Sequence, residues 1–417
     1  MIIMSMTSLP STPSDAPLFE EEASVPIFAE EPAEIDIFLD DDGFGQLTNC
    51  PHPFRKPIRA IGWIIRHTFG VASLILLLAV LAVIPIVNFF VLGYLLEAEA
   101  RVARTGKMRY AFHLIDVAPR IGSIVLGCWL WMFPLRLLSG VAGDVAIISP
   151  DSNRYFFLQG ATYIAASLVG LHLVFALARG GSLGCFFRPL KNVLWFSNQM
   201  RAGSYWEQAE RHLRSYLHTF RFKHHFLLGL KGFMGAMLWL VPPTLLFASA
   251  DSSEGVRIVV TIIGGLCLVV VFGWLPFLQS HVAAENRWKA IGNRKVASRI
   301  WAHAPIAAFL AVLMTFALAL PLYLLKVRLL PEDAMWVATL VYLISIYPAR
   351  IITGWAYSRG MRPDKPRSRW WLRWSMRLLS FAAIFAFTVL LFFTQDISEH
   401  GKLALFEHHA FLLPVPF

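Results

Sequence analysis

The longest uncharged stretch of the chain runs from Thr68 to Leu96 and contains a single proline, Pro85. A straight helix over these 29 residues would be ~43 Å long, whereas the hydrocarbon core of a bilayer is only ~30 Å thick. Matching the two lengths by tilt alone would need roughly 45°, which is outside the usual range. Because Pro85 lacks a backbone donor and disfavours helical geometry at Ile84, the stretch is predicted either to kink or to turn back there.

Seven further apolar segments follow, each at least 20 residues long, which is enough to cross a bilayer. The connections between them alternate between short ones and longer, more basic ones. This pattern predicts an all-α protein, a polytopic transmembrane helix bundle whose membrane domain covers residues 51–394. The predicted spans are 121–142, 157–178, 226–249, 258–280, 304–325, 334–357 and 375–394.

The distribution of lysine and arginine distinguishes two interpretations of the first apolar stretch. If 68–96 forms a re-entrant hairpin, 29 basic residues lie on one side of the membrane and five on the other. If it crosses once as a kinked span, the split becomes 25 against nine. Because cytoplasmic connections carry an excess of Lys and Arg, the count favours seven spans plus one re-entrant hairpin over the alternative of eight spans. The first limb of that hairpin, 68–84, would be ~25 Å long.

The same rule predicts the side on which each end of the chain lies. Both interpretations make residues 395–417 an extracytoplasmic tail, and the hairpin also keeps the N-terminus in the cytoplasm. The composition, 57% hydrophobic and 15% charged, is typical of a multi-pass membrane protein. Residues 1–54 hold 11 of the 27 acids and no Lys or Arg, so the remainder carries 37 bases against 16 acids. These bases flank apolar spans, so the bilayer, and not nucleic acid, is the expected partner.

Two segments outside the spans are candidates for docking. Residues 1–50 contain no basic region before an apolar core, so they do not form a signal peptide. Their acids, prolines and serines predict a disordered acidic tail, and its recurring apolar pairs are typical of a segment that docks a protein partner. A basic amphipathic helix is predicted over 204–222, beginning with the capping-box pattern Ser204 to Glu207 and lying along the membrane surface.

The chain shows few signatures of catalysis or metal binding. The sequence contains no phosphate-binding glycine loop, no dinucleotide-binding motif and no zinc-protease motif. One G-x-S-x-G match at Gly180 follows a predicted span, whereas a nucleophile elbow follows a strand. The four cysteines have no C-x-x-C spacing. We therefore expect a protein that is not an enzyme and uses no cofactor or metal. The terminal acids and histidines are expected to be exposed: Glu399, His400, Glu407, His408 and His409.

Polar residues inside apolar spans are candidates for function, because exposing them to lipid is unfavourable. The candidates here are Asn88, Gln279 and Arg350. We predict that Arg350 faces protein, with backbone carbonyls, an aromatic ring or a polar side chain of another span as its partners. Directly after the first stretch, Glu97, Arg101 and Arg104 follow one another at four- and three-residue spacing, which predicts a row of ion pairs on one helical face.

Two classes of function agree with these patterns. The first is a non-catalytic membrane scaffold or assembly protein that docks a partner through its acidic tail and basic surface helix. The second is a transporter or channel that uses helices broken at Pro85, Pro276 and Pro348, since broken helices are typical of transport sites. The few charges within spans, mostly near span ends, favour the scaffold. A polar cavity lined by the three candidate residues would favour transport, and a tightly packed interior would favour the scaffold.

Three stretches carry a resemblance to a known family. They are IPIVNFFVLGYLLEAEARVARTGKM at 84–108, HVAAENRWKAI at 281–291 and YPARIITGWAYSRG at 347–360. They resemble a bacterial family of uncharacterised multi-pass membrane proteins, a domain of unknown function. The family's aspartate-rich segment after the first hairpin is largely missing, with Asp116 remaining. The resemblance implies an integral protein of the bacterial cytoplasmic (inner) membrane and implies no known activity.

Overall fold

The computed structural model describes residues 51–412 with several gaps. The gaps are 53, 116, 204–205, 207–209, 211–219, 250–254, 326–334, 399–400 and 409. The predicted acidic tail and most of the predicted surface helix over 204–222 therefore lie outside the described residues. Regular structure in the described part of the chain is helical throughout. The longer helices are α1 (Pro57–Val83), α2 (Asn88–Thr105), α3 (Ala118–Ile148), α4 (Asn153–Ala178), α6 (Pro189–Arg201), α8 (Phe222–Phe247), α9 (Gly255–Glu285), α10 (Arg294–His303), α11 (Pro305–Leu325), α12 (Met335–Met361) and α13 (Trp370–Ile397).

Eight of the described helices are long and apolar enough to cross a membrane. Each of the seven predicted spans coincides with one of them, which confirms the prediction of an all-helical, multi-pass membrane protein. The helices extend a few residues beyond the predicted bounds, as in α3 and α9, each of which has 31 residues. The eighth helix is α1, which contains the first limb of the proposed hairpin.

The chain breaks at Pro85, as predicted, but the helix before the break is longer than expected. Helix α1 begins at Pro57 and has 27 residues, which gives a length of ~40 Å in place of the ~25 Å expected for the first limb. Residues 84–87 form a turn in which Ile86 has a left-handed φ of 70°. The backbone N–H of Asn88 donates to the Ile84 carbonyl at 3.1 Å, which starts α2 directly after the turn.

The predicted breaks at the other two prolines are wrong. Helix α9 continues from Gly255 to Glu285 through Pro276, and α12 continues through Pro348 to Met361. A proline inside a membrane-length helix removes one backbone donor, and packing by neighbouring helices compensates for that loss. Pro276 is buried against other helices, whereas Pro348 is exposed and its neighbours Tyr347 and Ala349 are buried.

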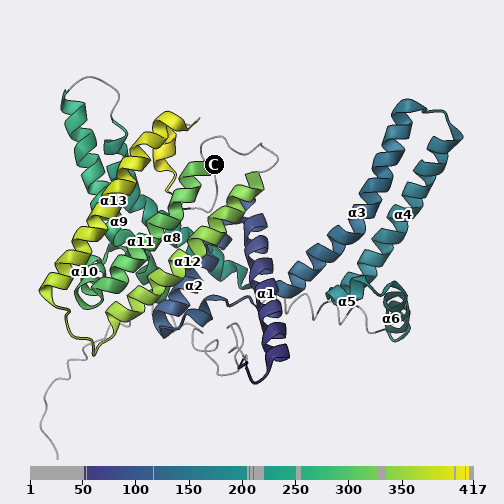
Figure 1. Cartoon of the computed structure of the whole chain (residues 1–417), viewed down its shortest axis with the longest axis horizontal. Helices are drawn as coiled ribbons and strands as arrows, with labels where there is room; N and C mark the ends of the chain where they lie inside the picture. The colour runs from purple at the N-terminus through teal and green to yellow at the C-terminus, as the bar shows by residue number, and fades with distance from the viewer. Residues whose placement is uncertain are drawn as a thin grey trace, which may run out of the picture. The chain divides into compact units, whose positions relative to one another are not determined.

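Helix α2 lies at the centre of the bundle, where it contacts α1, α8, α9 and α12 (Figure 1). Glycines allow the backbones to meet there. A Cβ on Gly93 would lie 1.6 Å from the His225 carbonyl oxygen, and one on Gly229 would lie 1.9 Å from the Phe89 carbonyl oxygen. On the other face, a Cβ on Gly354 would lie 2.3 Å from the backbone oxygen of Glu99. Small residues permit this close approach of helices in membranes, so α8 and α12 hold α2 in a fixed register.

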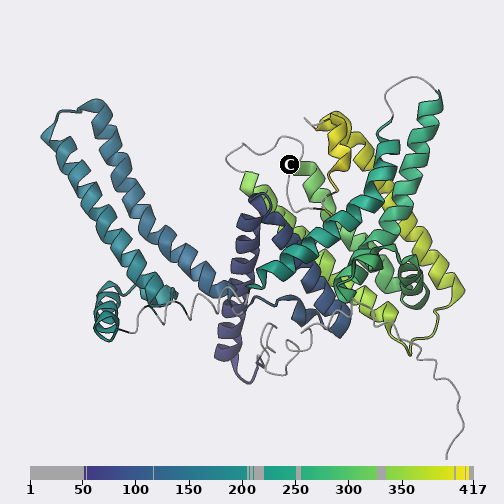
Figure 2. The same ribbon diagram turned by 180° about the vertical axis from the view of Figure 1, so that it is seen from behind.

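Helices α3 and α4 run side by side, and α3 also contacts α1 (Figures 1 and 2). The short helix α5 (Leu183–Phe186) packs against both of them. The indole N–H of Trp131 donates to the Phe186 carbonyl at 2.9 Å, and the imidazole Nε2 of His172 lies 3.0 Å from the same oxygen. The Phe186 carbonyl thus connects α3, α4 and α5.

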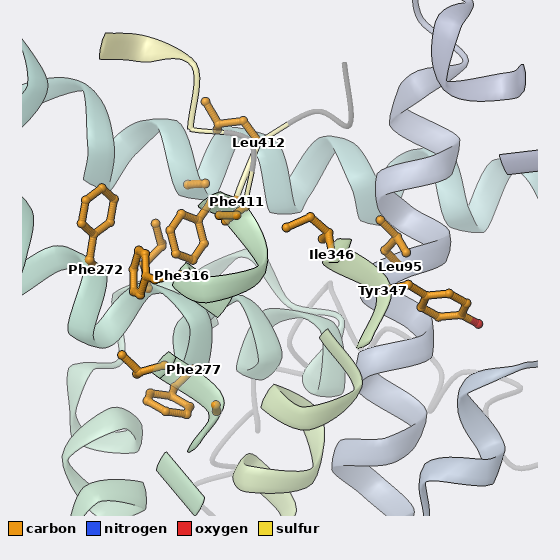
Figure 3. Close-up of a cluster of buried hydrophobic side chains, with 14 of the residues drawn as sticks. Leu95, Phe272, Phe277, Phe316, Ile346, Tyr347, Phe411 and Leu412 are labelled. Atoms are coloured by element: carbon orange, nitrogen blue, oxygen red, sulfur yellow. The ribbon is translucent and has the colours of Figure 1, made fainter. Parts of the chain in front are cut away.

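The end of the chain packs into the bundle. His408 is buried and Glu407 is half-buried, which corrects the expectation that these side chains are exposed, whereas Glu399, His400 and His409 lie outside the described residues. After α13 and the short 3₁₀ helix Gly401–Phe406, residues Ala410, Phe411 and Leu412 are buried. Phe411 packs against Phe272 and Phe316, with ring centroids 5.8 and 5.9 Å away (Figure 3). The run of apolar residues in this segment explains the difference, since burying one such side chain contributes ~1.5–3 kcal/mol.

Candidate functional site

Glu99 is a fully buried carboxylate on the central helix α2. No basic residue follows or precedes it at three- or four-residue spacing on that helix. Its partners therefore come from other helices. The hydroxyl of Ser280 on α9 donates to Oε1, and Nη1 of Arg350 on α12 lies 3.1 Å from Oε2. Each carboxylate oxygen thus receives a donor from a different helix.

Arg350 is 4% exposed and binds three elements of the fold. Besides Glu99, Nη1 donates to Oε1 of Gln279 at 2.8 Å, and Nη2 donates to the carbonyl of Ala410 at 2.9 Å. The prediction that Arg350 faces protein, bound by backbone carbonyls and polar side chains of other spans, is confirmed. Desolvation of a guanidinium is strongly unfavourable unless it is paired and hydrogen-bonded, and this arrangement supplies both at Nη1 and Nη2, while the buried Nε has no partner among the described residues.

Gln279 connects the ion pair to the end of the chain. Its amide nitrogen donates to the carbonyl of Phe411 at 2.8 Å and to that of Gly232 at 3.3 Å, while its oxygen accepts from Arg350. The side chain is fully buried. Helices α8, α9 and α12 and the C-terminal segment therefore meet at one hydrogen-bonded cluster, which we call the ion-pair cluster: Glu99, Gln279, Ser280 and Arg350.

Asn88 does not belong to the ion-pair cluster, although it was predicted from the sequence as a candidate together with Gln279 and Arg350. It begins α2 eleven residues before Glu99, a distance of ~16 Å along the helix axis. Its side chain is buried, and its Oδ1 has no hydrogen-bond partner among the described residues. At the break, Asn88 bonds through its backbone N–H and not through this oxygen.

The predicted row of ion pairs on α2 is present, on a separate face from Glu99. The Glu97 carboxylate accepts from Nε of Arg101 at 3.1 Å and from Nη2 of Arg104 at 3.0 Å, and the imidazole of His224 lies 3.4 Å from Oε2. Burial acts to raise the pKa of the Glu97 carboxyl, but the His224 contact and the two arginines outweigh it and hold that pKa well below its usual range. Glu97 is therefore ionised and matched by an excess of positive charge.

A third polar group joins α2, α8 and α12. The hydroxyl of Tyr347 donates to the Ala111 carbonyl at 2.9 Å, so the Tyr94 hydroxyl, 3.0 Å away, donates to Tyr347. Tyr94 stacks on His113 with centroids 4.2 Å apart, and Nε2 of His113 lies 3.0 Å from Nε2 of His225. Burial, with the nearby Arg101 and His225, holds the pKa of His113 well below its ordinary value, so its ring is neutral.

The chemistry available to these groups is that of structural contacts. Ser280 is fully buried and its hydroxyl proton is engaged by Glu99, so it lacks the exposed, base-activated geometry of a nucleophile. The neighbouring His281 ring meets the Tyr357 hydroxyl at 2.9 Å. Within the described ranges, no group of three or more His, Cys, Asp or Glu residues is placed to hold a metal ion. The arrangement links helices to each other more directly than it presents reactive atoms to a ligand.

Sequence reasoning missed Glu99 and the C-terminal carbonyls. A signal for Glu99 was present, because this acid lies among apolar residues and has no basic neighbour on its own helical face. Such an acid must find its partner on another helix, and Arg350 is a basic residue within an apolar run. The backbone carbonyls of Ala410 and Phe411 carry no sequence signal, since every residue has one.

The eight membrane-length helices and the buried ion-pair cluster together define a multi-pass helical membrane protein. Comparison of the chain with protein-family models, with curated proteins and with solved structures gave no match.

Proposed function

We propose that this chain is a non-catalytic membrane scaffold or assembly protein. The observation that carries the proposal is the ion-pair cluster, in which the buried charges Glu99 and Arg350 are engaged by each other, by Gln279 and by the end of the chain. Groups that served a transported solute or a reaction would need donors or acceptors left available for it. Both Nη atoms of Arg350 are engaged, and its Nε is the atom of this guanidinium with no partner in the described part of the chain. Here the same groups connect four helices and the C-terminal segment, which supports a rigid platform.

In this proposal the partner binds outside the membrane domain. The acidic residues 1–50 form a cytoplasmic docking segment, and the basic residues predicted to form the surface helix over 204–222 provide a second docking segment. The charge pattern of the sequence and its resemblance to bacterial membrane proteins support a location in the bacterial cytoplasmic (inner) membrane, with the C-terminus extracytoplasmic.

The proposed topology includes the hairpin, with α1 entering from the cytoplasm and α2 returning to it. The turn at 84–87 and the charge split of 29 against five support it. Cysteine labelling tests it in two variants from which the other cysteines are removed, one retaining Cys50 and one carrying Thr105→Cys. An impermeant reagent added to intact cells should label neither thiol. Labelling of Cys50 without labelling at position 105 would show a single crossing instead.

A transporter or channel is the second candidate function. The break at Pro85 favours it, together with the buried Asn88, whose Oδ1 has no hydrogen-bond partner in the described part of the chain. Two observations weaken it: α9 and α12 continue through Pro276 and Pro348, and Asn88 lies far from the ion-pair cluster along α2. We therefore place it second.

Affinity purification from cross-linked membranes tests the scaffold. We expect a defined set of soluble proteins to be recovered with the natural chain and lost when the eleven acids of residues 1–50 are changed to Asn or Gln. The matched control, Asp144→Asn with Asp151→Asn, removes acids from another connection and should retain the same proteins. Equal recovery with both variants would contradict docking through the tail.

Reconstitution into liposomes separates the scaffold from the transporter. We expect ion flux, measured with a potential-sensitive dye, to equal that of protein-free liposomes. A flux that the natural chain supports and that Glu99→Gln abolishes would contradict the scaffold and support transport.

A further inference from the structure

A cavity of about 320 Å³ opens between α9, α10 and α13, three helices that contact one another (Figure 1). Its walls are mainly apolar and aromatic, with Trp274, Trp301, Phe381 and Ile384 among the lining residues. Known ligand pockets have volumes of ~300–1,000 Å³, so this cavity is large enough for part of a ligand. None of the groups of the ion-pair cluster lines it.

Two polar side chains of α13 also line the cavity. Ser380 is 2% exposed, and its hydroxyl has no hydrogen-bond partner among the described residues. Arg377 is exposed at the cavity. Arg373 lies one turn before it on the same face, with a buried Nε that has no partner in the described part of the chain. An acidic side chain pairs with neither arginine within the described ranges. Two like charges at this spacing repel each other, so an anion bound between the two arginines would be stabilised.

Further bases lie on α10, the second helix that lines the cavity. Helix α10 is tied to the residues before α13, because the Ser368 N–H donates to the Ala302 carbonyl at 3.0 Å. The α10 helix buries one face against the bundle and exposes its bases on the other. The guanidinium of Arg294 lies over the ring of Trp274, 5.7 Å from its centroid, which places a second charge against the cavity wall. The exposed bases of this helix are Arg294, Lys295 and Arg299.

The position along α13 matches the interface of a bilayer. Three tryptophans, Trp370, Trp371 and Trp374, are exposed in its first turns, and tryptophan is enriched where hydrocarbon meets headgroups. Arg377 follows Trp370 by ~10 Å along the helix, a depth from which a long side chain still reaches phosphate. The apolar walls lie farther along the same helix, at Phe381 and Ile384.

We propose that this cavity binds one anionic glycerophospholipid. Arg377, with Arg373 and Arg294, contacts the phosphate and the anionic headgroup, and part of an acyl chain fills the space lined by Trp301, Phe381 and Ile384. The Ser380 hydroxyl donates to an ester oxygen of the same lipid. Free phosphate has no group to occupy the apolar walls, and a zwitterionic lipid leaves the excess positive charge unbalanced.

Native mass spectrometry of the full chain in detergent, titrated with dioleoyl phosphatidylglycerol, tests the proposal. We expect one phosphatidylglycerol to bind the natural chain more tightly than dioleoyl phosphatidylcholine does. Arg377→Gln should weaken the first binding step about fivefold or more, as expected for one base at an anionic headgroup. The matched control is Arg367→Gln, which removes the same charge from an exposed position that does not line the cavity, and it should leave the first step unchanged.

A second variant changes the cavity without changing the charge. A Cβ on Gly273 would meet Ile384 Cδ1 at an ordinary 3.8 Å, so Gly273→Leu should fold and fill the space, and phosphatidylglycerol should bind it more weakly. If Arg377→Gln does not fold, the binding of phosphatidylglycerol to Gly273→Leu tests the proposal by itself. Equal loss in Arg377→Gln and Arg367→Gln, equal binding of both lipids, unchanged binding by Gly273→Leu, or full competition by inorganic phosphate would each overturn the proposal.

Discussion

Replacing Arg350 with methionine should unfold the membrane domain far more easily than a typical substitution does. The change leaves the fully buried Glu99 with Ser280 as its remaining donor. It also removes the N–H groups that donate to the side-chain oxygen of Gln279 and to the carbonyl of Ala410. Removing one partner of a buried ion pair is expected to destabilise by ~3–5 kcal/mol. A neutral hydrogen bond between membrane helices contributes only ~0.6 kcal/mol on average. The two magnitudes are far enough apart to be distinguished by experiment.

The measurement is a double-mutant cycle on the free energy of unfolding in mixed micelles, titrated with sodium dodecyl sulfate and followed by far-ultraviolet circular dichroism. The cycle compares Arg350→Met, Glu99→Met and the double variant. We expect the double variant to lose less stability than either single variant, because it contains no uncompensated buried charge. The control is Arg367→Met, an exposed arginine in the connection between α12 and α13 and outside the spans, which should change stability by no more than ~0.5 kcal/mol.

Two results would refute this reasoning. The first is a loss below ~1 kcal/mol in Arg350→Met, which would mean that the guanidinium is not desolvated as the structure shows. The second is a double variant that loses the sum of the single effects, because additivity would mean that Glu99 and Arg350 do not interact.

Three further predictions follow from the packing of α2 and the C-terminal segment. Gly93→Ala should destabilise by at least ~3 kcal/mol, because the new Cβ would overlap the His225 carbonyl, whereas Gly62→Ala, with nothing within 4 Å, should be neutral or slightly stabilising in the same unfolding titration. Deleting residues 409–417 should destabilise the chain and raise amide exchange near the ion-pair cluster in hydrogen-exchange mass spectrometry, because two carbonyl acceptors are removed; unchanged exchange there would contradict the role given to this segment. The lowered pKa of His113 means that the unfolded chain binds one more proton at this residue below pH ~6.5, so its contribution to stability should be complete above that pH and fall by about 2 kcal/mol towards pH 5. His113→Gln should reduce the total loss by about that amount, and a wild-type stability that is constant from pH 7 to pH 5 would show the prediction to be wrong.

The sequence alone determined the class of the protein and most of its helices. Long uncharged runs leave few alternatives to membrane-length helices, because every backbone polar group in hydrocarbon must be satisfied within the chain. The break at Pro85 and the ion pairs of Glu97 with Arg101 and Arg104 were also predictable, since both depend on neighbours a few residues apart. The burial of Arg350 was predictable for a different reason, which is the high free energy of a charge exposed to lipid.

The tertiary structure decided which distant residues meet. Proline at positions 276 and 348 has the same local effect as at position 85, yet those two helices continue. At the buried Pro276, packing against neighbouring helices compensates for the missing donor. The separation of Asn88 from Gln279 and Arg350 likewise depends on how the helices are placed and not on residue type.

The strongest example is the ion-pair cluster itself. Glu99 and Arg350 are 251 residues apart in the sequence, and the guanidinium is completed by the carbonyl of Ala410 near the end of the chain. Local patterns predict that a buried charge needs a partner, but they do not identify which distant acid or carbonyl is that partner. That choice is made when Gly93, Gly229 and Gly354 let α8 and α12 approach α2 closely enough to fix the register of all three helices.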